Sequence, residues 1–317
     1  MVGAVGASFA ARQIETMTKS PSPLPPLVPI VILHRNEFDN LELMLSSIVE
    51  HTQYRYALFV IDNNSSRVDS ALRLDRIAAV YGATVIRSPR NNWVFGFNLA
   101  LAHPQFPHLS KYYVFSDADI VVPPISPGGM CWLEHMVHQM DQHACIGKLG
   151  ISLAVDDIDN VMLGGEVTRQ RARFNQNPSI GCNVIAPVDT TLAIYRPDFF
   201  VGPRFRFSVG HASLARPYYY TCRTAAEVEA RHLGWYEAHR IDLDDSALTE
   251  KIRCFAKFGA YIEPALLARR PLADNLYYRV IHPLAILYWG ARVAVTNLVY
   301  LVKHFPRRVN VLQYKCR

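Results

Sequence analysis

The feature that most constrains the fold is an alternation, between residues 28 and 124, of short apolar runs and amphipathic stretches. Apolar runs of strand length occur at Val28–Leu33, Ala57–Ile61, Thr84–Ile86 and Tyr113–Phe115. Stretches with helical periodicity separate the first three of them. Strands that alternate with helices at these lengths predict an α/β fold, with a mainly parallel sheet, helices on both faces and right-handed connections.

Two helices are predicted in this region. The first spans about 40–50, where Asp39 and Glu42 form a capping box. Its apolar face consists of Leu41, Met44, Leu45 and Ile48. The second spans 68–81, and its inward residues are predicted to be Val68, Leu72 and Ala79.

Polar residues follow the strands, and parallel strands bring their carboxyl ends to one edge of a sheet. Asp62, the pair Asn91–Asn92, and Asp117 with Asp119 are therefore expected to converge there. Two carboxylates at i and i+2 can face one hard cation and leave positions for phosphate oxygens. The alternative for this Asp-x-Asp is a strand that ends in a solvated aspartate turn.

Composition limits the function classes. The chain has 317 residues, 50% hydrophobic and 19% charged, which is enough to bury a sizeable core. No G-x-G-x-x-G or G-x-x-x-x-G-K-[ST] opens a helix, which disfavours NAD-type and P-loop proteins. The six cysteines include no C-x-x-C pair, as expected of free thiols in a reducing cytosol. The N-terminus lacks a basic start and makes a poor signal peptide.

The net charge of +6 comes largely from a basic tail made of Lys303, Arg307, Arg308, Lys315 and Arg317. Such a tail suits an anionic membrane surface, or simply a solvated charged end. No nucleic-acid module is visible, so no nucleic-acid partner is expected.

Four segments in order resemble family-2-type glycosyltransferases of the GT-A fold, which belong to the nucleotide-diphospho-sugar transferases. They are PIVILHRNEFDNLELMLSSI, ALFVIDNNSS, NNWVFGFNLAL and FSDADIVVP, and together they cover roughly residues 28–124. KLGISLAVDDIDN, APVDTTLAIYRPDFF and ARHLGWY resemble segments of enzymes that build bacterial surface polysaccharides. The usual Glu-Asp pair that carries the catalytic base in this family is not evident.

The resemblance implies a role for each matching residue. Asp62 would bind the nucleotide base, and Asp117 and Asp119 would bind Mn²⁺ or Mg²⁺ on the donor diphosphate. His232 is the candidate for a further metal ligand, or else a histidine packed beside Trp235 and Tyr236. The residues expected to contact the nucleotide sugar are His34, Arg35, Asp62, Asn63, Asn92, Asn98 and Asp117, with Asn91 beside them.

An inverting transfer also needs a carboxylate to take the proton of the acceptor hydroxyl. Asp189, which precedes the strand-like TTLAIY, is the first candidate, although it could be a turn carboxylate at the strand start. Glu229 is the second candidate, with Asp156 and Asp157 in reserve. Aromatic residues at 218–220, with Trp235 and Tyr236, could stack on a sugar or pack under a loop.

Three regions are expected. Residues 1–29 form an irregular, proline-rich leader. Residues 30–262 form the GT-A domain, with a nucleotide-binding half (30–124) and an acceptor-binding half (125–262). Residues 263–317 form a basic helical segment. Ile281–Val302 is long enough to span a bilayer, but Pro283 and Arg292 favour a helix lying at the membrane interface, or one packed on the core or in a dimer interface.

The sequence therefore predicts a metal-dependent, inverting glycosyltransferase of polysaccharide or glycoconjugate biosynthesis. A UDP-sugar is the favoured donor, the acceptor is a glycan or lipid-linked glycan, and the expected location is cytoplasmic, peripheral at the inner face of the membrane. One alternative is a carbohydrate-binding scaffold that kept the fold and lost turnover. Another is a sugar nucleotidyltransferase, which LHRNEF disfavours because that class has a Gly-rich loop after the first strand.

Overall fold

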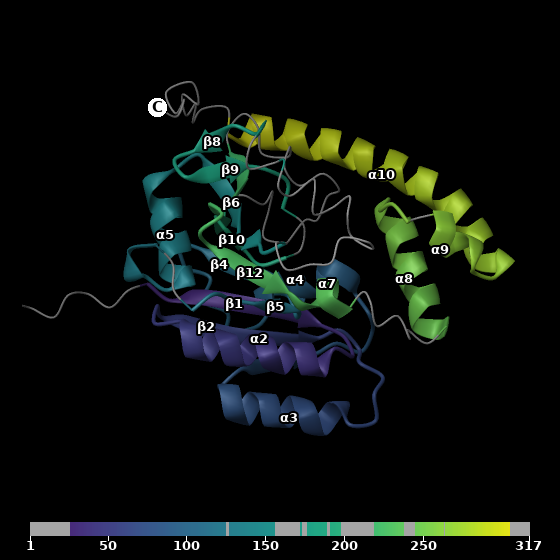
Figure 1. Ribbon diagram of the computed structural model, residues 1–317, viewed down its shortest axis with the longest axis horizontal. Coiled ribbons are helices and arrows are strands. Elements are labelled where there is room, and N and C mark those ends of the chain that lie inside the picture. Colours follow the sequence, from purple (N-terminus) through teal and green to yellow (C-terminus); the bar gives the residue numbers. More distant parts are fainter. Residues whose placement is uncertain are drawn as a thin grey trace, which may run out of the picture.

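The computed structural model describes residues 26–124, 127–155, 172, 176–188, 191–197, 219–237, 245–262 and 264–304. Within them, one mixed sheet runs in the order β3-β2-β1-β4-β10-β6-β11-β9-β8 (Figure 1). Its strands are β1 (Val28–His34), β2 (Tyr56–Asp62), β3 (Thr84–Arg87), β4 (Tyr113–Asp117), β6 (Ile146–Gly150), β8 (Ser179–Ile180), β9 (Asn183–Ile185), β10 (Ala193–Tyr195) and β11 (Tyr220–Arg223).

A small second sheet has the order β5-β12-β7. It joins β5 (Ile120–Val121), β12 (Glu229–His232) and β7 (Ser152–Leu153). β12 is antiparallel to β5 and parallel to β7. This small sheet ties a segment near residue 230 to the chain that follows the metal-binding candidate Asp119.

The first half of the large sheet is parallel. β1 pairs in parallel with both β2 and β4, and β2 pairs in parallel with β3. β10 is antiparallel to both β4 and β6, which makes the sheet mixed. The predicted α/β class with a mainly parallel sheet is therefore confirmed, and the first three predicted strands agree with the structure within one residue at each end.

Helices cover both faces of the sheet. They are α2 (Phe38–His51), α3 (Ser70–Tyr81), α4 (Phe97–Leu101) and α5 (Trp132–Gln142), with the 3-10 turns η1 (Trp93–Gly96) and η2 (Pro127–Gly129). One core packs α2, α3 and α5 against Ile30 and Ile32 of β1, and the other packs α4 against Val31. Successive residues of a strand point to opposite faces, so β1 contributes to both cores and is buried on both sides.

Two local predictions are wrong. The capping box of Asp39 and Glu42 does not form, because α2 begins at Phe38. Both carboxylates instead receive hydrogen bonds from Arg73 Nη2 of α3, at 2.7 and 2.8 Å. Asp39 and Glu42 therefore join α2 to α3 and do not cap α2.

The predicted inward face of the second helix is also wrong. Val68 precedes α3 and is exposed, Leu72 is 75% exposed and Ala79 is exposed. Leu74 and Ile77 are the apolar side chains of α3 that are buried. They lie three residues apart on one face of the helix. The prediction of an amphipathic helix was therefore correct, but the prediction of which face is buried was wrong.

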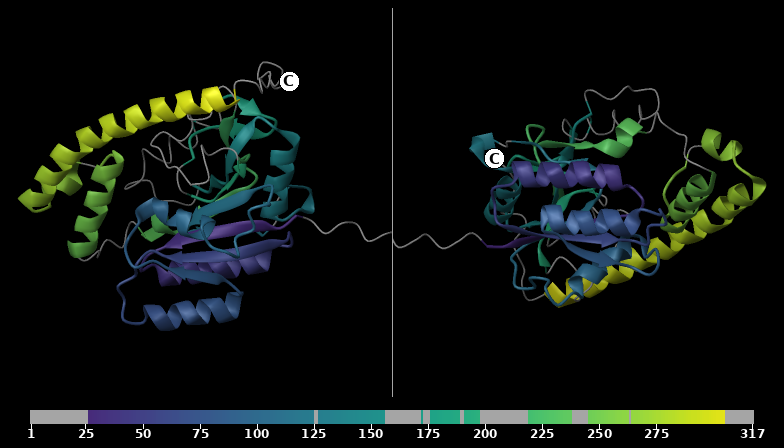
Figure 2. Two further views of the ribbon diagram at one scale, coloured as in Figure 1. Left: turned by 180° about the vertical axis from the view of Figure 1, so that it is seen from behind. Right: turned by 90° about the horizontal axis from the view of Figure 1, so that it is seen from below.

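The C-terminal region is helical. It contains α7 (Leu233–Glu237), α8 (Asp245–Phe258), α9 (Pro264–Ala268) and the long α10 (Leu272–His304). Ile252 and Ala256 of α8 pack with Leu267 of α9 and Tyr278 of α10 in a core of their own. Figures 1 and 2 show α10 running along one side of the molecule, with α8 and α9 beside its N-terminal half. None of the helices described is both long and apolar enough to cross a membrane.

Candidate active site

The carboxyl ends of the parallel strands bring the predicted polar residues to one edge. The register pairs His34 with Asp62, Leu33 with Asp117, and Asp62 with Arg87. The last residues of β1, β2 and β4 are therefore neighbours across the sheet. The predicted convergence of Asp62 and Asp117 on one edge is confirmed.

Asp62 and His34 form a buried polar pair at this edge. His34 Nε2 lies 3.6 Å from Asp62 Oδ1, and both residues are less than 9% exposed. Asp62 Oδ1 accepts a hydrogen bond from the Ser65 amide at 3.0 Å. Burial lowers the pKa of His34 to about 4, although the charge of Asp62 opposes the shift. His34 is therefore neutral at pH 7.

An asparagine network shapes the loop after β3. Asn63 Nδ2 donates to Asn91 Oδ1 at 2.9 Å and to the Trp93 carbonyl at 3.1 Å, and Asn63 Oδ1 accepts from the Asn92 amide at 2.8 Å. A Cβ at Gly96 would lie 2.5 Å from Leu33 Cδ1, so the glycine leaves this space to the leucine side chain of β1. Asn63 thereby fixes this loop against the ends of β1 and β2.

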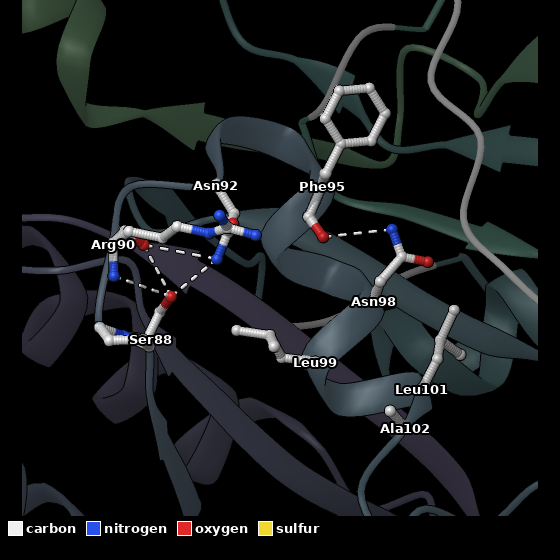
Figure 3. A pocket seen from close by; sticks show the side chains of 9 residues that line it. Ser88, Arg90, Asn92, Phe95, Asn98, Leu99, Leu101 and Ala102 are labelled. Carbon is white, nitrogen blue, oxygen red and sulfur yellow. Dashed lines mark hydrogen bonds between the residues drawn. The ribbon is translucent and has the colours of Figure 1, made fainter.

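A cavity of about 770 Å³ opens beside this loop (Figure 3). It lies between the segment after β3 and α4, and its lining residues are Ser88, Pro89, Arg90, Asn92, Phe95, Asn98, Leu99, Leu101 and Ala102. Asn92 Nδ2 donates to Ser88 Oγ at 2.7 Å, and Asn98 Nδ2 donates to the Phe95 carbonyl at 3.1 Å. Two of the predicted donor contacts, Asn92 and Asn98, therefore line one cavity.

Asp119 and His232 meet, although they are far apart in the sequence. His232 Nδ1 lies 3.3 Å from Asp119 Oδ2, and the Leu233 amide donates to the Asp119 carbonyl at 2.7 Å. The antiparallel pairing of β12 with β5 sets His232 opposite Ile120, beside Asp119. Trp235 stacks on the imidazole with ring centroids 5.1 Å apart, which fixes the ring plane. Asp117 ends β4, two residues before Asp119.

This pair suits a divalent cation that is shared with a substrate. Oxygen and imidazole nitrogen are ligands that Mn²⁺ accepts. A Cβ at Gly234 would lie 2.6 Å from Asp119 Oδ2, so the missing side chain leaves room next to the carboxylate. Within the described residues no group of three or more His, Cys, Asp or Glu is arranged to hold a metal ion. A cation bound here would therefore need diphosphate oxygens and water as its remaining ligands.

Helix α8 packs across the same edge, which the sequence did not predict. Arg35, at the end of β1, forms an ion pair with Glu250 of α8. Burial raises the pKa of Cys254 to about 12, and the charge of Asp117 acts in the same direction, as expected where α8 lies near the end of β4. Glu250 and Cys254 are four residues apart and so share one face of α8.

Aromatic residues extend this contact to α10. The rings of Trp93 and Phe258 have centroids 6.3 Å apart, and those of Phe258 and Trp289 lie 5.6 Å apart in a stacked arrangement. Lys257 Nζ lies 5.4 Å from the centre of the Trp93 ring. The predicted donor edge, α8 and α10 are therefore in direct contact. No motif in the sequence signals this, because Trp93, Phe258 and Trp289 are widely separated in the chain.

Of the candidates for the catalytic base, only Glu229 lies among the residues that the structure describes. Glu229 begins β12, and alternation along the strand directs it to the face opposite His232. Asp189 lies outside the described residues, as do Asp156, Asp157 and Tyr218. Tyr220 begins β11, whereas Tyr236 packs under Arg231, whose guanidinium carbon is 4.7 Å from the ring centre.

Comparison with protein families matches residues 30–162 to the model of glycosyl transferase family 2. This part of the chain is therefore similar to glycosyltransferases of family 2. The matched segment contains the strands that end in His34, Asp62 and Asp117. The glycosyltransferase resemblance stated from the sequence is thus confirmed. No curated protein matches the sequence.

The glycosyltransferase also resembles solved structures. A mannosyltransferase from Pyrobaculum calidifontis, in complex with GDP-Man and Mn²⁺, is 14% identical with a TM-score of 0.50, over 94% of this chain and 82% of that one. Residues 1–349 of TarS from S. aureus, with UDP, are 13% identical with a TM-score of 0.43, over 89% and 91%. GalNAc-T7 with UDP, GalNAc and Mn²⁺ is 15% identical with a TM-score of 0.49, over 90% and 57%. The first of these supports the GT-A fold.

Proposed function

We propose that this glycosyltransferase moves a sugar from a nucleotide-diphosphate sugar to a glycan or lipid-linked glycan, with inversion and with a divalent metal ion. The observation that carries the proposal is the approach of Asp119 to His232, 3.3 Å apart, beside the strand ends of a family 2 domain. A scaffold without turnover would have no need of a carboxylate and an imidazole held this close.

Asp119 and His232 are proposed to bind Mn²⁺ or Mg²⁺ directly, and Asp117 is proposed to bind it through water. A cation bound there would offset the negative charge of the leaving diphosphate. Asp62 is proposed to accept a hydrogen bond from the nucleotide base. His34, Arg35, Asn63, Asn92 and Asn98 are proposed to contact or position the donor. A UDP-sugar is proposed as the donor because of the family resemblance.

Asp189 is proposed as the catalytic base, whose carboxylate would take the proton of the acceptor hydroxyl. The pairing of β10 supports it, since β10 runs antiparallel to β4 with Ala193 opposite Phe115. Thr191, two residues after Asp189, therefore enters the sheet at the edge where β4 ends in Asp117. Glu229 is the weaker candidate because its strand turns it away from the face of His232.

The acceptor is proposed to be reached at the cytoplasmic face of an anionic membrane, in polysaccharide or glycoconjugate biosynthesis. The basic tail at Lys303, Arg307, Arg308, Lys315 and Arg317 supports this location.

The experiment is thermal stabilisation by UDP, GDP, dTDP and CMP, each with and without Mn²⁺. A ligand that binds only the folded protein raises the melting temperature by mass action, because it adds about 2.7 kcal/mol to the free energy of unfolding at a hundredfold excess over Kd. We expect one diphosphate to stabilise the wild type only with metal. Asp119→Asn and His232→Gln should lose the effect, whereas Glu50→Gln, an exposed carboxylate on α2, should keep it.

Equal stabilisation with and without Mn²⁺ would contradict the metal-dependent donor site. Stabilisation by no nucleotide would favour the carbohydrate-binding scaffold instead. Stabilisation by GDP and not by UDP would change the proposed donor to a GDP-sugar and leave the proposed class of reaction unchanged.

A further inference from the structure

Helix α10 presents an apolar face to solvent along almost its whole length. The exposed side chains recur every three, four or eight residues, so they share a stripe roughly 100° wide. They are Leu276, Val280, Leu284, Leu287, Val295, Leu298 and Val302. Leu284, Leu287 and Leu298 are 57%, 70% and 63% exposed. This is far more apolar surface than isolated exposed residues would present.

The opposite face of α10 is fixed to the rest of the protein. Tyr278, Ala285 and Trp289 are buried, and they recur at helical spacing on the side away from the exposed stripe. Trp289 Nε1 donates a hydrogen bond to the Lys257 carbonyl of α8 at 2.7 Å. The Tyr278 hydroxyl accepts a hydrogen bond from the Ile262 amide at 3.0 Å. The orientation of the exposed stripe is therefore set by contacts to α8.

From residue 275 to residue 317, the charged residues of the sequence have one sign. Residues 275–317 contain no aspartate or glutamate, and their cations are Arg279, Arg292, Lys303, Arg307, Arg308, Lys315 and Arg317. These seven cations exceed the net charge of +6 of the whole chain. A second copy of the chain on this face would gather like charges, whereas an anionic surface would neutralise them.

The border of the stripe on α10 carries side chains that are typical of helices lying on a bilayer. Tyr288 is 57% exposed at the border of the stripe, and Arg292 Nη1 donates to its hydroxyl at 3.1 Å. Tyrosine and arginine beside an apolar stripe suit the headgroup region, with the leucines below it.

We infer that the exposed stripe of α10 lies on the surface of an anionic lipid bilayer and holds the donor edge beside it. The second part rests on the proposed function, because the rings of Trp289, Phe258 and Trp93 connect α10 to the edge where the donor is proposed to bind. An enzyme held in this way would meet lipid-linked acceptors without releasing the membrane.

The experiment is flotation of the full chain with vesicles of phosphatidylcholine, alone or mixed with phosphatidylglycerol. The variant Leu284→Glu/Leu287→Glu/Leu298→Glu removes three leucines of the stripe. The matched control, Leu43→Glu/Leu72→Glu/Val80→Glu, changes three exposed apolar residues of α2 and α3. Circular dichroism checks that each variant is folded, and stabilisation by nucleotide with Mn²⁺ is measured on each.

We expect the wild type and the control to float only with the mixed vesicles, and less so in high salt. The α10 variant should lose about tenfold or more of its partitioning, since each leucine contributes apolar area. The inference is overturned if the wild type floats with neither kind of vesicle. It is also overturned if the α10 variant floats like the wild type. A wild-type dimer in light scattering that only the α10 variant dissociates overturns it as well. If nucleotide with Mn²⁺ still stabilises the α10 variant, a flotation result against the inference concerns the membrane-facing stripe and not the proposed donor site.

Discussion

Trp93 has a φ of 53°, a backbone conformation that bulky residues rarely adopt. Its amide donates to Asn91 Oδ1 at 2.9 Å, and its carbonyl accepts from Asn63 Nδ2 at 3.1 Å, so polar contacts hold the conformation in place. The ring then contacts Phe258 of α8. A glycine would fit the backbone without strain, so what favours tryptophan is the contact with α8. Sequence periodicity carries no information on such a conformation.

The buried histidine at the end of β1 predicts a pH dependence of stability. Because burial lowers the pKa of His34 to about 4, the unfolded chain binds a proton that the folded chain excludes between pH 6.5 and 4. Stability should be fully present above pH 6.5 and fall with pH through this window. The contribution of His34 is on the order of 3 kcal/mol. Urea unfolding from pH 4 to 7 should show the decline.

His34→Gln should flatten this decline, and His108→Gln, at an exposed histidine, should not. Burial also lowers the pKa of His135 and His143, so part of the slope should remain in the His34 variant. An unchanged slope in His34→Gln would rule out this assignment.

Gly234 allows a test of the Asp119–His232 pair that leaves both residues in place. A Cβ at Gly234 would lie 2.6 Å from Asp119 Oδ2, and the carboxylate can turn away at little cost in stability. Gly234→Ala should therefore fold normally and lose about tenfold or more of its affinity for Mn²⁺ in the presence of nucleotide. Isothermal titration would measure this loss.

The control is Gly290→Ala in α10, where a Cβ meets nothing within 4 Å. It should leave metal binding unchanged and stabilise the helix by roughly 0.5–1 kcal/mol. A Gly234→Ala protein that binds metal like the wild type would place the metal elsewhere.

At the scale of elements, α8 links the proposed donor edge to the C-terminal helix α10. One end of its inward face reaches Arg35 through Glu250, and the other end reaches Trp93 and Trp289 through Phe258. No helix was predicted between residues 245 and 258, and the packing partners of α8 come from three distant parts of the chain. The predicted boundary between a domain ending at 262 and a helical segment starting at 263 stays a prediction.

Truncating the aromatic contact should loosen this link. Phe258→Ala removes a half-buried ring that contacts Trp93, Phe95 and Trp289, and should lower the free energy of unfolding by about 1–3 kcal/mol. Tyr261→Ala, at a ring that is 73% exposed, should change it by less than about 0.5 kcal/mol. Equal effects of the two variants in urea denaturation would mean that Phe258 does not hold α8 in place.

At the scale of the whole molecule, the parallel half of the sheet was predictable and the rest was not. Residues 28–81 alternate two seven-residue strands with amphipathic helices, so local periodicity indicates both their type and their order. After residue 125 the described strands have two to five residues, too few for a periodic signal. The proximity of His232 to Asp119 followed from the family resemblance, and its role as a metal ligand stays a prediction. The fit of α8 and α10 to the donor edge depends on tertiary contacts that no local pattern encodes.

The position of β10 between β4 and β6 has a consequence for biosynthesis. As the chain leaves the ribosome, β1 to β4 can pair as soon as residue 117 has emerged, because β1, β2 and β3 pair only within this group and only the outer edge of β4 waits for β10. Among the strands that the structure describes, β6 is complete at residue 150 and first gains a partner when residues 193–195 follow it. A nascent chain stalled between these points would hold the finished parallel part of the sheet beside an unpaired strand, the kind of edge that chaperones recognise.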